Sequence, residues 1–205
     1  MDDVRPDTLG DVLVLGLGHT GQAVARYLLH LADDPATAAR VGSVTVVGGA
    51  KSSDGPAVQA LRDAGAAVTA GEDSVEGAYD LCVASPGISE FSDLFAAGRA
   101  ASAAVVGEPE LVWRESPERW IAITGTNGKT TTTSLTTALL EGAGIDAVSV
   151  GNIGTNLADV LDAGRPAGQW YVAELSSFQL ATTERLHPRV ACLLNVTPDH
   201  LEWHR

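Results

Sequence analysis

The sequence has few cysteines and no apolar run long enough to cross a membrane. Its two cysteines, Cys82 and Cys192, lie in the apolar stretches LCVAS and ACLLN, which are typical of buried thiols and not of a disulfide framework. A membrane-spanning helix needs about 18 consecutive apolar residues or more, and the sequence contains no such run and no signal peptide. These absences argue against a secreted or membrane protein, and we expect a cytoplasmic one.

Positive charge is also scarce. The chain has 13 lysines and arginines against 26 aspartates and glutamates, and its net charge at pH 7 is -13. This balance argues against nucleic acid or an anionic membrane as the main partner. Only two lysines occur, Lys51 and Lys129. A site for an anionic ligand must therefore concentrate positive potential locally, which draws attention to these two positions.

What the chain does contain is an alternation of short β-branched runs with longer, alanine-rich amphipathic runs. In a chain of 205 residues with 45% apolar and 19% charged residues, this alternation predicts an α/β protein whose parallel sheets are covered by helices on both faces. The polar, proline-containing stretch WRESPERW interrupts the series. We therefore predict a Rossmann-like domain over residues 1–115 and a second α/β domain over residues 119–205.

A first glycine-rich loop, GLGHTG, places Gly16, Gly18 and Gly21 between a predicted strand and a predicted helix. This spacing allows a tight turn and lets backbone N–H groups approach a diphosphate at the start of the helix. A dinucleotide site also carries an acidic residue at the end of the second strand, where this sequence has Gly48 and Gly49. Three interpretations stay open: a redox dinucleotide, another diphosphate ligand, or glycines needed only for close packing.

A second glycine-rich loop, TGTNGKTT, also follows a predicted strand and opens a helix. The backbone amides of residues 125–128 would cradle phosphate oxygens, and Lys129 would place a point charge near the β- and γ-phosphates. The Thr130 hydroxyl would bind Mg²⁺. The usual motif has a glycine where this chain has Ile123, so the loop is a shortened variant. We predict that it binds ATP or GTP.

Polar residues follow two later strands of the second half. Glu174 ends the strand in AELSS, and Asp199 and His200 follow the next strand in NVTPDH. Ligands of parallel sheets bind at the carboxyl ends of the strands, so these groups are candidates to share Mg²⁺ with the phosphate loop. Glu174 as a surface carboxylate and Asp199 as an ordinary first-turn residue are the alternatives. His200 and His204 are four residues apart, but HLEWH is not the zinc motif H-E-x-x-H, which argues against zinc.

Several segments together resemble the Mur ligases. TGTNGKTTTT, GNIG, ELSSFQL and NVTPDHLEWH resemble the central ATPase domain of that family, and GLGHTG, VASPGIS and VGEPELVW resemble the N-terminal domain of one member. The resemblance covers residues 12–204. It implies a Rossmann-like domain with a parallel sheet followed by a truncated P-loop ATPase domain, in a cytoplasmic, monomeric enzyme of peptidoglycan precursor synthesis.

The resemblance also assigns ligands to residues. The N-terminal domain is expected to bind the UDP of a sugar substrate and not NAD. The residues implied in UDP-sugar binding are Gly18, His19, Thr20, Ser85, Pro86, Gly87, Asn152 and Ser176. Those implied in ATP binding are Gly125, Thr126, Asn127, Gly128, Lys129, Thr130 and Thr131. Thr130, Glu174 and His200 are implied as Mg²⁺ ligands, and Lys129, Glu174 and His200 as catalytic.

Four residues, in two segments, depart from the pattern of the family member that the sequence resembles. His19 stands where a leucine is expected, and Gly48, Gly49 and Ala50 stand where Asp-Thr-Arg is expected. Lys51 or Ser52 is a candidate to replace the arginine.

The implied reaction forms an amide. ATP activates the L-alanyl carboxylate of UDP-N-acetylmuramoyl-L-alanine as an acyl phosphate, and the amine of D-glutamate then displaces phosphate. Mg²⁺ and Lys129 would neutralise the repulsion between the reacting anions. Alternatives are another Mur-type ligase, a nucleotide-binding module without catalysis, and an NAD-dependent oxidoreductase.

The resemblance also implies parts that this sequence does not contain. The family carries a carbamylated lysine after the Asp-His motif, whereas only Lys51 and Lys129 occur here, and no third domain follows Arg205. We therefore expect a piece of a ligase that binds substrates and does not complete the reaction by itself.

Overall fold

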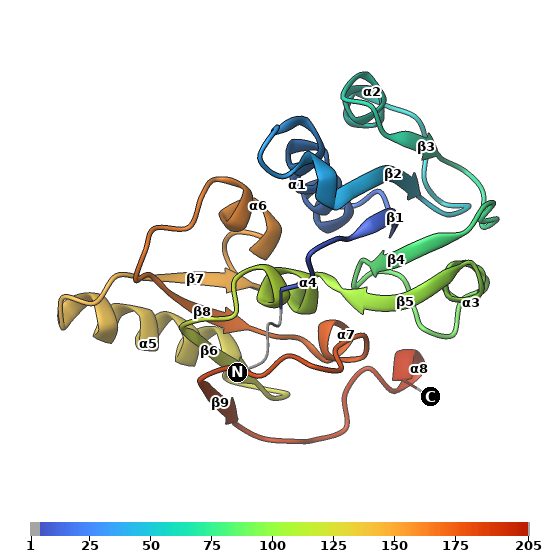
Figure 1. Cartoon of the computed structure of the whole chain (residues 1–205). Coiled ribbons are helices and arrows are strands. Elements are labelled where there is room, and N and C mark those ends of the chain that lie inside the picture. The colour runs from blue at the N-terminus through green and yellow to red at the C-terminus, as the bar shows by residue number, and fades with distance from the viewer. Residues whose placement is uncertain (1–4, 205) are drawn as a thin grey trace.

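Two parallel sheets form the framework of the protein (Figure 1). The computed structural model describes residues 5–204, so residues 1–4 of the predicted first domain and the expected chain end at Arg205 lie outside the described residues. Within the described part, no helix is long and apolar enough to span a membrane. The prediction of an α/β protein with parallel sheets is confirmed.

The first sheet has the strand order β3-β2-β1-β4-β5, and every pairing in it is parallel. Its strands are β1 (Gly10–Leu15), β2 (Val41–Val47), β3 (Ala67–Thr69), β4 (Tyr79–Ala84) and β5 (Ser102–Gly107). The helices of this half are α1 (His19–Asp33), the 3-10 turn η1 (Ala38–Arg40), α2 (Pro56–Asp63), α3 (Asp93–Ala100) and α4 (Glu108–Glu115). The order reverses between β1 and β4, because α1 leads outward to β2 and α3 leads outward to β5.

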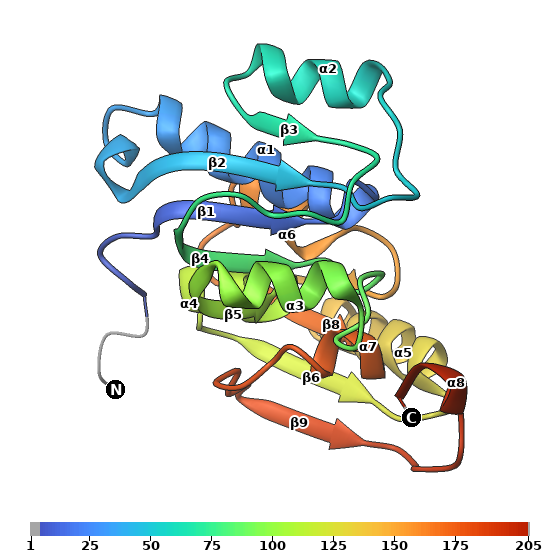
Figure 2. The same cartoon turned by 90° about the vertical axis from the view of Figure 1, so that its right-hand side faces the viewer.

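The second sheet has the order β7-β8-β6-β9 and is again parallel throughout. Its strands are β6 (Trp120–Thr124), β7 (Ala147–Gly151), β8 (Trp170–Glu174) and β9 (Val190–Leu193). The helices are α5 (Lys129–Gly142), α6 (Leu157–Asp162), α7 (Ser177–Leu180) and α8 (Leu201–His204). Figure 2 shows the arrows of β1, β2, β6 and β9 pointing to the same side, so the carboxyl edges of both sheets face that side.

Alternation along each strand divides its side chains between two apolar layers. In β1, Val12 and Val14 face the α1 layer, whereas Leu13 and Leu15 join a cluster with Leu94 of α3. All four side chains are buried, which explains why this central strand is a continuous apolar run. The α1 layer continues through α6 into the second sheet as one apolar cluster. That the two halves are separate domains therefore stays a prediction.

Helix α4 carries a buried carboxylate that belongs to the first half. Glu115 accepts two hydrogen bonds of 2.7 Å from Arg40, one of 2.9 Å from the Tyr27 hydroxyl and one of 3.1 Å from Arg5 Nε. Burial alone would raise the pKa of this carboxyl, but the Arg40 and Tyr27 bonds outweigh burial and lower the pKa of Glu115. Burial beside this carboxylate raises the pKa of Tyr27. The paired charges fasten α4 to α1 and to the start of β2.

Two further buried carboxylates of α4 reach into the second half. Glu110 accepts the backbone N–H groups of Glu184 and Arg185 and pairs with Arg114. Glu108 accepts the backbone N–H of Ala158, in the first turn of α6, at 3.0 Å. Glu108 has no cationic partner among residues 5–204, and burial raises its pKa to about 7, against the bond from Ala158. Figure 1 shows α4 between the two sheets, where these contacts join them.

The Glu108 carboxyl should make the stability of the fold depend on pH. Its folded pKa of about 7 lies above the ordinary value of 4.5, so the folded chain binds the extra proton, and stability falls as pH rises through that window. Glu108→Gln keeps an oxygen for Ala158 N–H and removes the charge. We expect the variant to gain up to about 3 kcal/mol over the wild type at pH 8 and nearly nothing at pH 4.5. Urea unfolding followed by tryptophan fluorescence at both pH values measures this.

Glu141→Gln, on an exposed position of α5, is the control and should leave the pH dependence unchanged. Parallel pH curves for Glu108→Gln and the wild type would show that Glu108 is not the titrating group.

Candidate functional site

The second glycine loop joins the end of β6 to the start of α5. Gly125 has φ 143° and Gly128 has φ 85°, a backbone region that L side chains rarely adopt. A Cβ at Gly125 would also come within 3.1 Å of the backbone N and O of Asn195. Gly128 is the N-cap of α5, so the helix begins at Lys129. The free N–H groups of the first helical turn therefore lie at the loop, as an anion site requires.

Lys129 folds back over this loop. Its Nζ donates to the carbonyl oxygens of Gly125 at 2.8 Å and Thr126 at 3.1 Å, and the side chain is half-buried. These bonds fix the position of one of the two lysines in a strongly acidic chain. The loop thus combines a fixed positive charge with the positive end of a helix dipole.

A cavity of about 460 Å³ opens beside the loop at the carboxyl ends of β6 and β9. It brings together Lys129, Asn152, Ser176 and His200, which sequence reasoning had assigned to different ligands. The other lining residues are Thr124, Gly125, Thr126, Ser177, Phe178, Leu180, Leu193, Asn195, Val196, Thr197 and Asp199. The remaining predicted ATP residues, Asn127, Gly128, Thr130 and Thr131, are exposed on the loop and the first turn of α5 and do not line the cavity.

Glu174 lies behind the cavity wall, at the carboxyl end of β8. Its side chain is 1% exposed, and Oε1 accepts a 2.8 Å hydrogen bond from Asn152 Nδ2, whose residue lines the cavity. Oε2 is buried and has no hydrogen-bond partner within the described part of the chain. A buried carboxylate oxygen without a donor is costly, so this atom fits a cation or a ligand donor.

His200 lines the cavity and has an unusual backbone. Its φ is 49°, and its ring lies against the Phe178 ring with centroids 4.8 Å apart. The side chain is 48% exposed, so the imidazole is open to solvent and ligands. Asp199 Oδ1 accepts the His200 backbone N–H at 3.0 Å.

Among the described residues, no three or more His, Cys, Asp and Glu side chains form a metal-binding group. The set Thr130, Glu174 and His200 stays a prediction.

The first glycine loop lies at the switch point of the first sheet, between β1 and β4. Gly16 has φ 102°, and a Cβ at Gly21 would come within 1.9 Å of the Gly16 carbonyl oxygen. Close approach of α1 to the loop therefore requires Gly21. A Cβ on Gly18, the N-cap of α1, would have no described residue within 4 Å, which leaves the start of the helix open to a ligand.

The predicted residues after β4 meet this loop. Ser85 donates its backbone N–H to the Leu15 carbonyl at 2.9 Å, and its buried Oγ has no partner. A Cβ at Gly16 would lie 2.9 Å from that Oγ. Pro86 is half-buried and Gly87 is exposed beside it. His19 is exposed and Thr20 half-buried in the first turn of α1. The structure thus gathers the predicted UDP residues of the first half at one edge.

The end of β2 is crowded where a dinucleotide site carries its acidic residue. A Cβ at Gly48 would come within 2.2 Å of Ser52 Oγ and 2.4 Å of Leu17 Cδ1. Ser52 Oγ is already engaged, because it donates to the Gly49 carbonyl and accepts the Gly71 N–H. Lys51 is exposed and is therefore the cation of this stretch that is open to a ligand.

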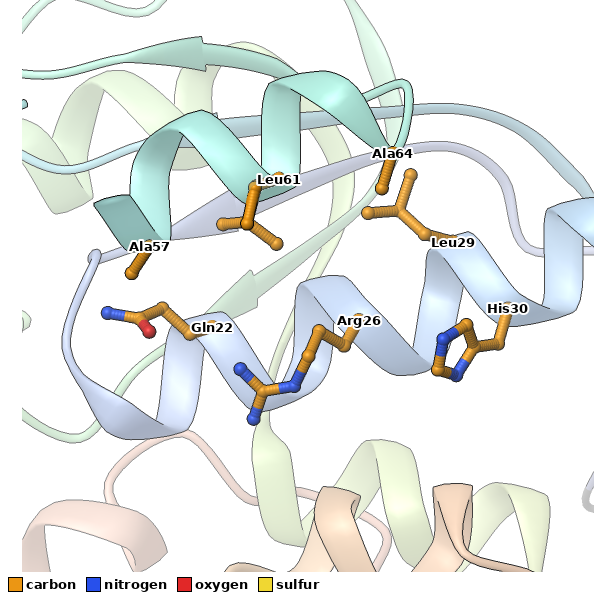
Figure 3. A pocket seen from close by; sticks show the side chains of 8 residues that line it. Gln22, Arg26, Leu29, His30, Ala57, Leu61 and Ala64 are labelled. Atoms are coloured by element: carbon orange, nitrogen blue, oxygen red, sulfur yellow. The ribbon is translucent and has the colours of Figure 1, made fainter. Parts of the chain in front are cut away.

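A further cavity, of about 220 Å³, lies between α1 and α2 (Figure 3). Its wall is mostly apolar, with Leu29, Leu61 and alanines of α2. The polar side chains around it are engaged elsewhere: Arg26 with Asp159 at 2.9 Å, His30 with Asp162 at 2.8 Å, and Gln22 with the Leu17 carbonyl. The residues that line this cavity therefore do not form a catalytic site.

The two sheets and the phosphate loop define the class as α/β proteins with a P-loop-like half. Residues 123–205 match the family described as the Mur ligase middle domain. Over these residues the chain has the Mur ligase middle domain.

Curated relatives within that family are UDP-N-acetylmuramoylalanine--D-glutamate ligases. The protein of Frankia casuarinae is 43% identical over 199 residues, which are 94% of this chain and 40% of that protein. The protein of Thermobifida fusca is 39% identical over 199 residues, 94% of this chain and 41% of that protein. This chain thus spans about two fifths of the length of these relatives.

Among solved structures, the chain is similar to UDP-N-acetylmuramate:L-alanyl-gamma-D-glutamyl-meso-diaminopimelate ligase from Neisseria meningitides. The TM-score is 0.49 at 18% identity, over 95% of this chain and 63% of that one.

Sequence reasoning did not single out Asn195, Thr197 or Phe178, which also line the cavity. All three lie inside the quoted segments ELSSFQL and NVTPDH, but their residue types do not predict contact with a phosphate loop.

Gly21→Ala should destabilise the protein by about 2–4 kcal/mol, because its Cβ would collide with main chain that cannot move aside. Gly18→Ala is the matched control, since a Cβ there meets nothing, and we expect a change within about 1 kcal/mol. Guanidinium unfolding of both variants measures the difference. Equal stability of the two variants would mean that α1 does not approach Gly16 closely.

Proposed function

We propose that the protein acts in an ATP-dependent ligation that adds D-glutamate to UDP-N-acetylmuramoyl-L-alanine, in the synthesis of a peptidoglycan precursor. The observation that carries the proposal is the cavity beside Lys129, which joins the phosphate loop to Asn152, Ser176 and His200. The relatives' names support the choice of substrates. Because the chain spans about two fifths of those relatives, the reaction belongs to the whole protein, and this chain supplies the UDP-sugar and ATP sites.

In the proposed reaction, a carboxylate oxygen of the L-alanyl group attacks the γ-phosphorus of ATP. The bond to the bridging oxygen breaks, ADP leaves, and an acyl phosphate forms. The D-glutamate amine then attacks the acyl carbon, inorganic phosphate leaves, and the amine loses a proton. No protein nucleophile is needed. The first transfer brings two anions together, so the ammonium of Lys129 and the N–H groups at the start of α5 would stabilise the charge on the phosphoryl oxygens.

Mg²⁺ would be held by residues in and around this cavity. The unpartnered Oε2 of Glu174 and the exposed imidazole of His200 would hold it, with the Thr130 hydroxyl as a third candidate. The ion would neutralise phosphate charge when bound. Asn152 would orient Glu174 through its hydrogen bond to Oε1.

The first half would hold the UDP diphosphate between the start of α1 and Ser85. The partnerless Ser85 Oγ is a donor available there, and Lys51 is the nearby free cation of the β2 end. The crowding at Gly48 leaves no place for the acidic group that binds an NAD ribose. A cytoplasmic protein goes with this proposal, because ATP and the UDP-sugar are cytoplasmic substrates, and that it is a monomer stays a prediction.

Binding of UDP-N-acetylmuramoyl-L-alanine should stabilise the folded chain. At about 100 times its dissociation constant, a ligand of the folded state adds roughly 2.7 kcal/mol. We expect the melting temperature to rise by several degrees, because the ligand binds only the folded chain. Differential scanning fluorimetry with the UDP-sugar, UDP and NADH measures this. A shift with NADH and none with the UDP-sugar would favour an oxidoreductase over the ligase.

Lys129→Ala should weaken ATP binding by about 100-fold or more, since the variant loses the fixed charge and the two bonds that hold it over the loop. UDP-sugar affinity should not change. Lys51→Ala, which removes the other lysine, is the matched control and should bind Mg-ATP as the wild type does. Isothermal titration calorimetry gives both affinities. If Lys129→Ala binds ATP as tightly as the wild type does, the loop is not part of the nucleotide site.

A further inference from the structure

One asparagine side chain, from the segment after β9, is hydrogen-bonded to the phosphate loop. Asn195 follows β9, and its Oδ1 accepts the backbone N–H of Asn127 at 2.9 Å. Its Nδ2 donates to the Asn127 carbonyl, also at 2.9 Å. A primary amide has the donor and the acceptor of a peptide group, so this side chain pairs with Asn127 as a neighbouring strand would.

Main-chain contacts extend the same junction. The Asn195 carbonyl accepts the Thr126 N–H at 3.2 Å. Thr126 Oγ1 donates to the Thr197 carbonyl at 3.1 Å and accepts the Thr197 N–H at 3.0 Å. The close approach of Gly125 to Asn195 belongs to this junction as well. Thr126 and Asn127 of the loop are thus hydrogen-bonded to Asn195 and Thr197.

Such a junction matters because a phosphate loop works through the direction of its backbone N–H groups. Gly125 and Gly128 adopt positive φ values, and glycine loses more conformational freedom on ordering than other residues do. A loop that is already held in shape binds its ligand without that ordering cost. The chain segment that holds it continues within five residues to His200, so the loop and the imidazole are placed by the same stretch.

We propose that Asn195 is a positioning residue for nucleotide binding: its side-chain amide holds the phosphate loop in the conformation that accepts the polyphosphate of a nucleoside triphosphate. That ATP is the ligand rests on the proposed function. The role of Asn195 rests on the hydrogen bonds described above. Asn195 is exposed, so the amide contributes little to global stability and its effect is confined to the loop.

Asn195→Ala tests the proposal through binding. We expect the dissociation constant for Mg-ATP to rise about 10-fold, as the loss of two hydrogen bonds implies, with UDP-sugar affinity unchanged and the melting temperature nearly so. Asn156→Ala is the matched control, because it also removes an asparagine hydrogen bond, to Asp159, away from the loop. It should bind Mg-ATP within twofold of the wild type. Calorimetry on the whole chain measures these affinities.

Amide hydrogen exchange by NMR tests the contact itself, without a nucleotide. The Asn127 amide should exchange at least 10-fold faster in Asn195→Ala, whereas the Thr126 amide, bonded to the Asn195 main chain, should change less. Asn195→Asp is a second variant: it keeps the acceptor for Asn127 N–H but turns an anionic oxygen toward the Asn127 carbonyl. We expect it to retain Asn127 protection and to lose at least as much ATP affinity.

The outcomes separate this proposal from the proposed function. If the wild type binds no Mg-ATP, both fall. If the wild type binds it and Asn195→Ala binds equally well, or if Asn127 exchange is the same in both, only the positioning role falls. Weaker ATP binding together with faster Asn127 exchange, in a variant that melts like the wild type, establishes it.

Discussion

The pairing of buried carboxylates on α4 is the constraint on which the arrangement of the two sheets depends. A carboxylate removed from water is costly unless donors or cations surround it, so each one specifies its neighbours. Glu115 is matched within the first half by Arg40 and Tyr27. Glu110 instead takes main-chain N–H groups after α7, and Glu108 takes one at the start of α6. One short helix thereby holds both halves in a single relative placement.

That placement decides where ligands can meet. In parallel sheets, loops after the strands gather at the carboxyl edge, and here both edges face one side of the molecule (Figure 2). The first glycine loop and the phosphate loop therefore open toward the same space. The proposed reaction between a diphosphate-bearing substrate and a nucleoside triphosphate would use this arrangement, which neither half could provide alone. The cavity beside Lys129 draws its walls from the carboxyl ends of all four strands of the second sheet, and its shape follows from the same topology.

Much of the site was predictable because its local signals are strong. Glycines at fixed spacing after an apolar run predicted both loops, and Gly21 and Gly128 are required there by close approach and by positive φ. Glu174 was predicted as a strand-end carboxylate, but its burial and its bond to Asn152 were not. Asn195 could not be predicted as a partner of Asn127, because 68 residues separate them and an asparagine after a strand has many ordinary roles.

The sequence by itself determined the elements: alternation of apolar and polar residues is a local property, so it predicted the strands, the helices that cover them and the glycine turns between them. The sequence also showed that Gly48 stands where a dinucleotide site has an acidic residue, but it did not show how closely other side chains pack around Gly48. Only the tertiary structure decided which residues meet across the chain. It placed Leu17 and Ser52 against Gly48, and it left one Glu174 oxygen without a partner. Such contacts depend on strand order and on the packing of distant segments, and short-range periodicity carries no information about either.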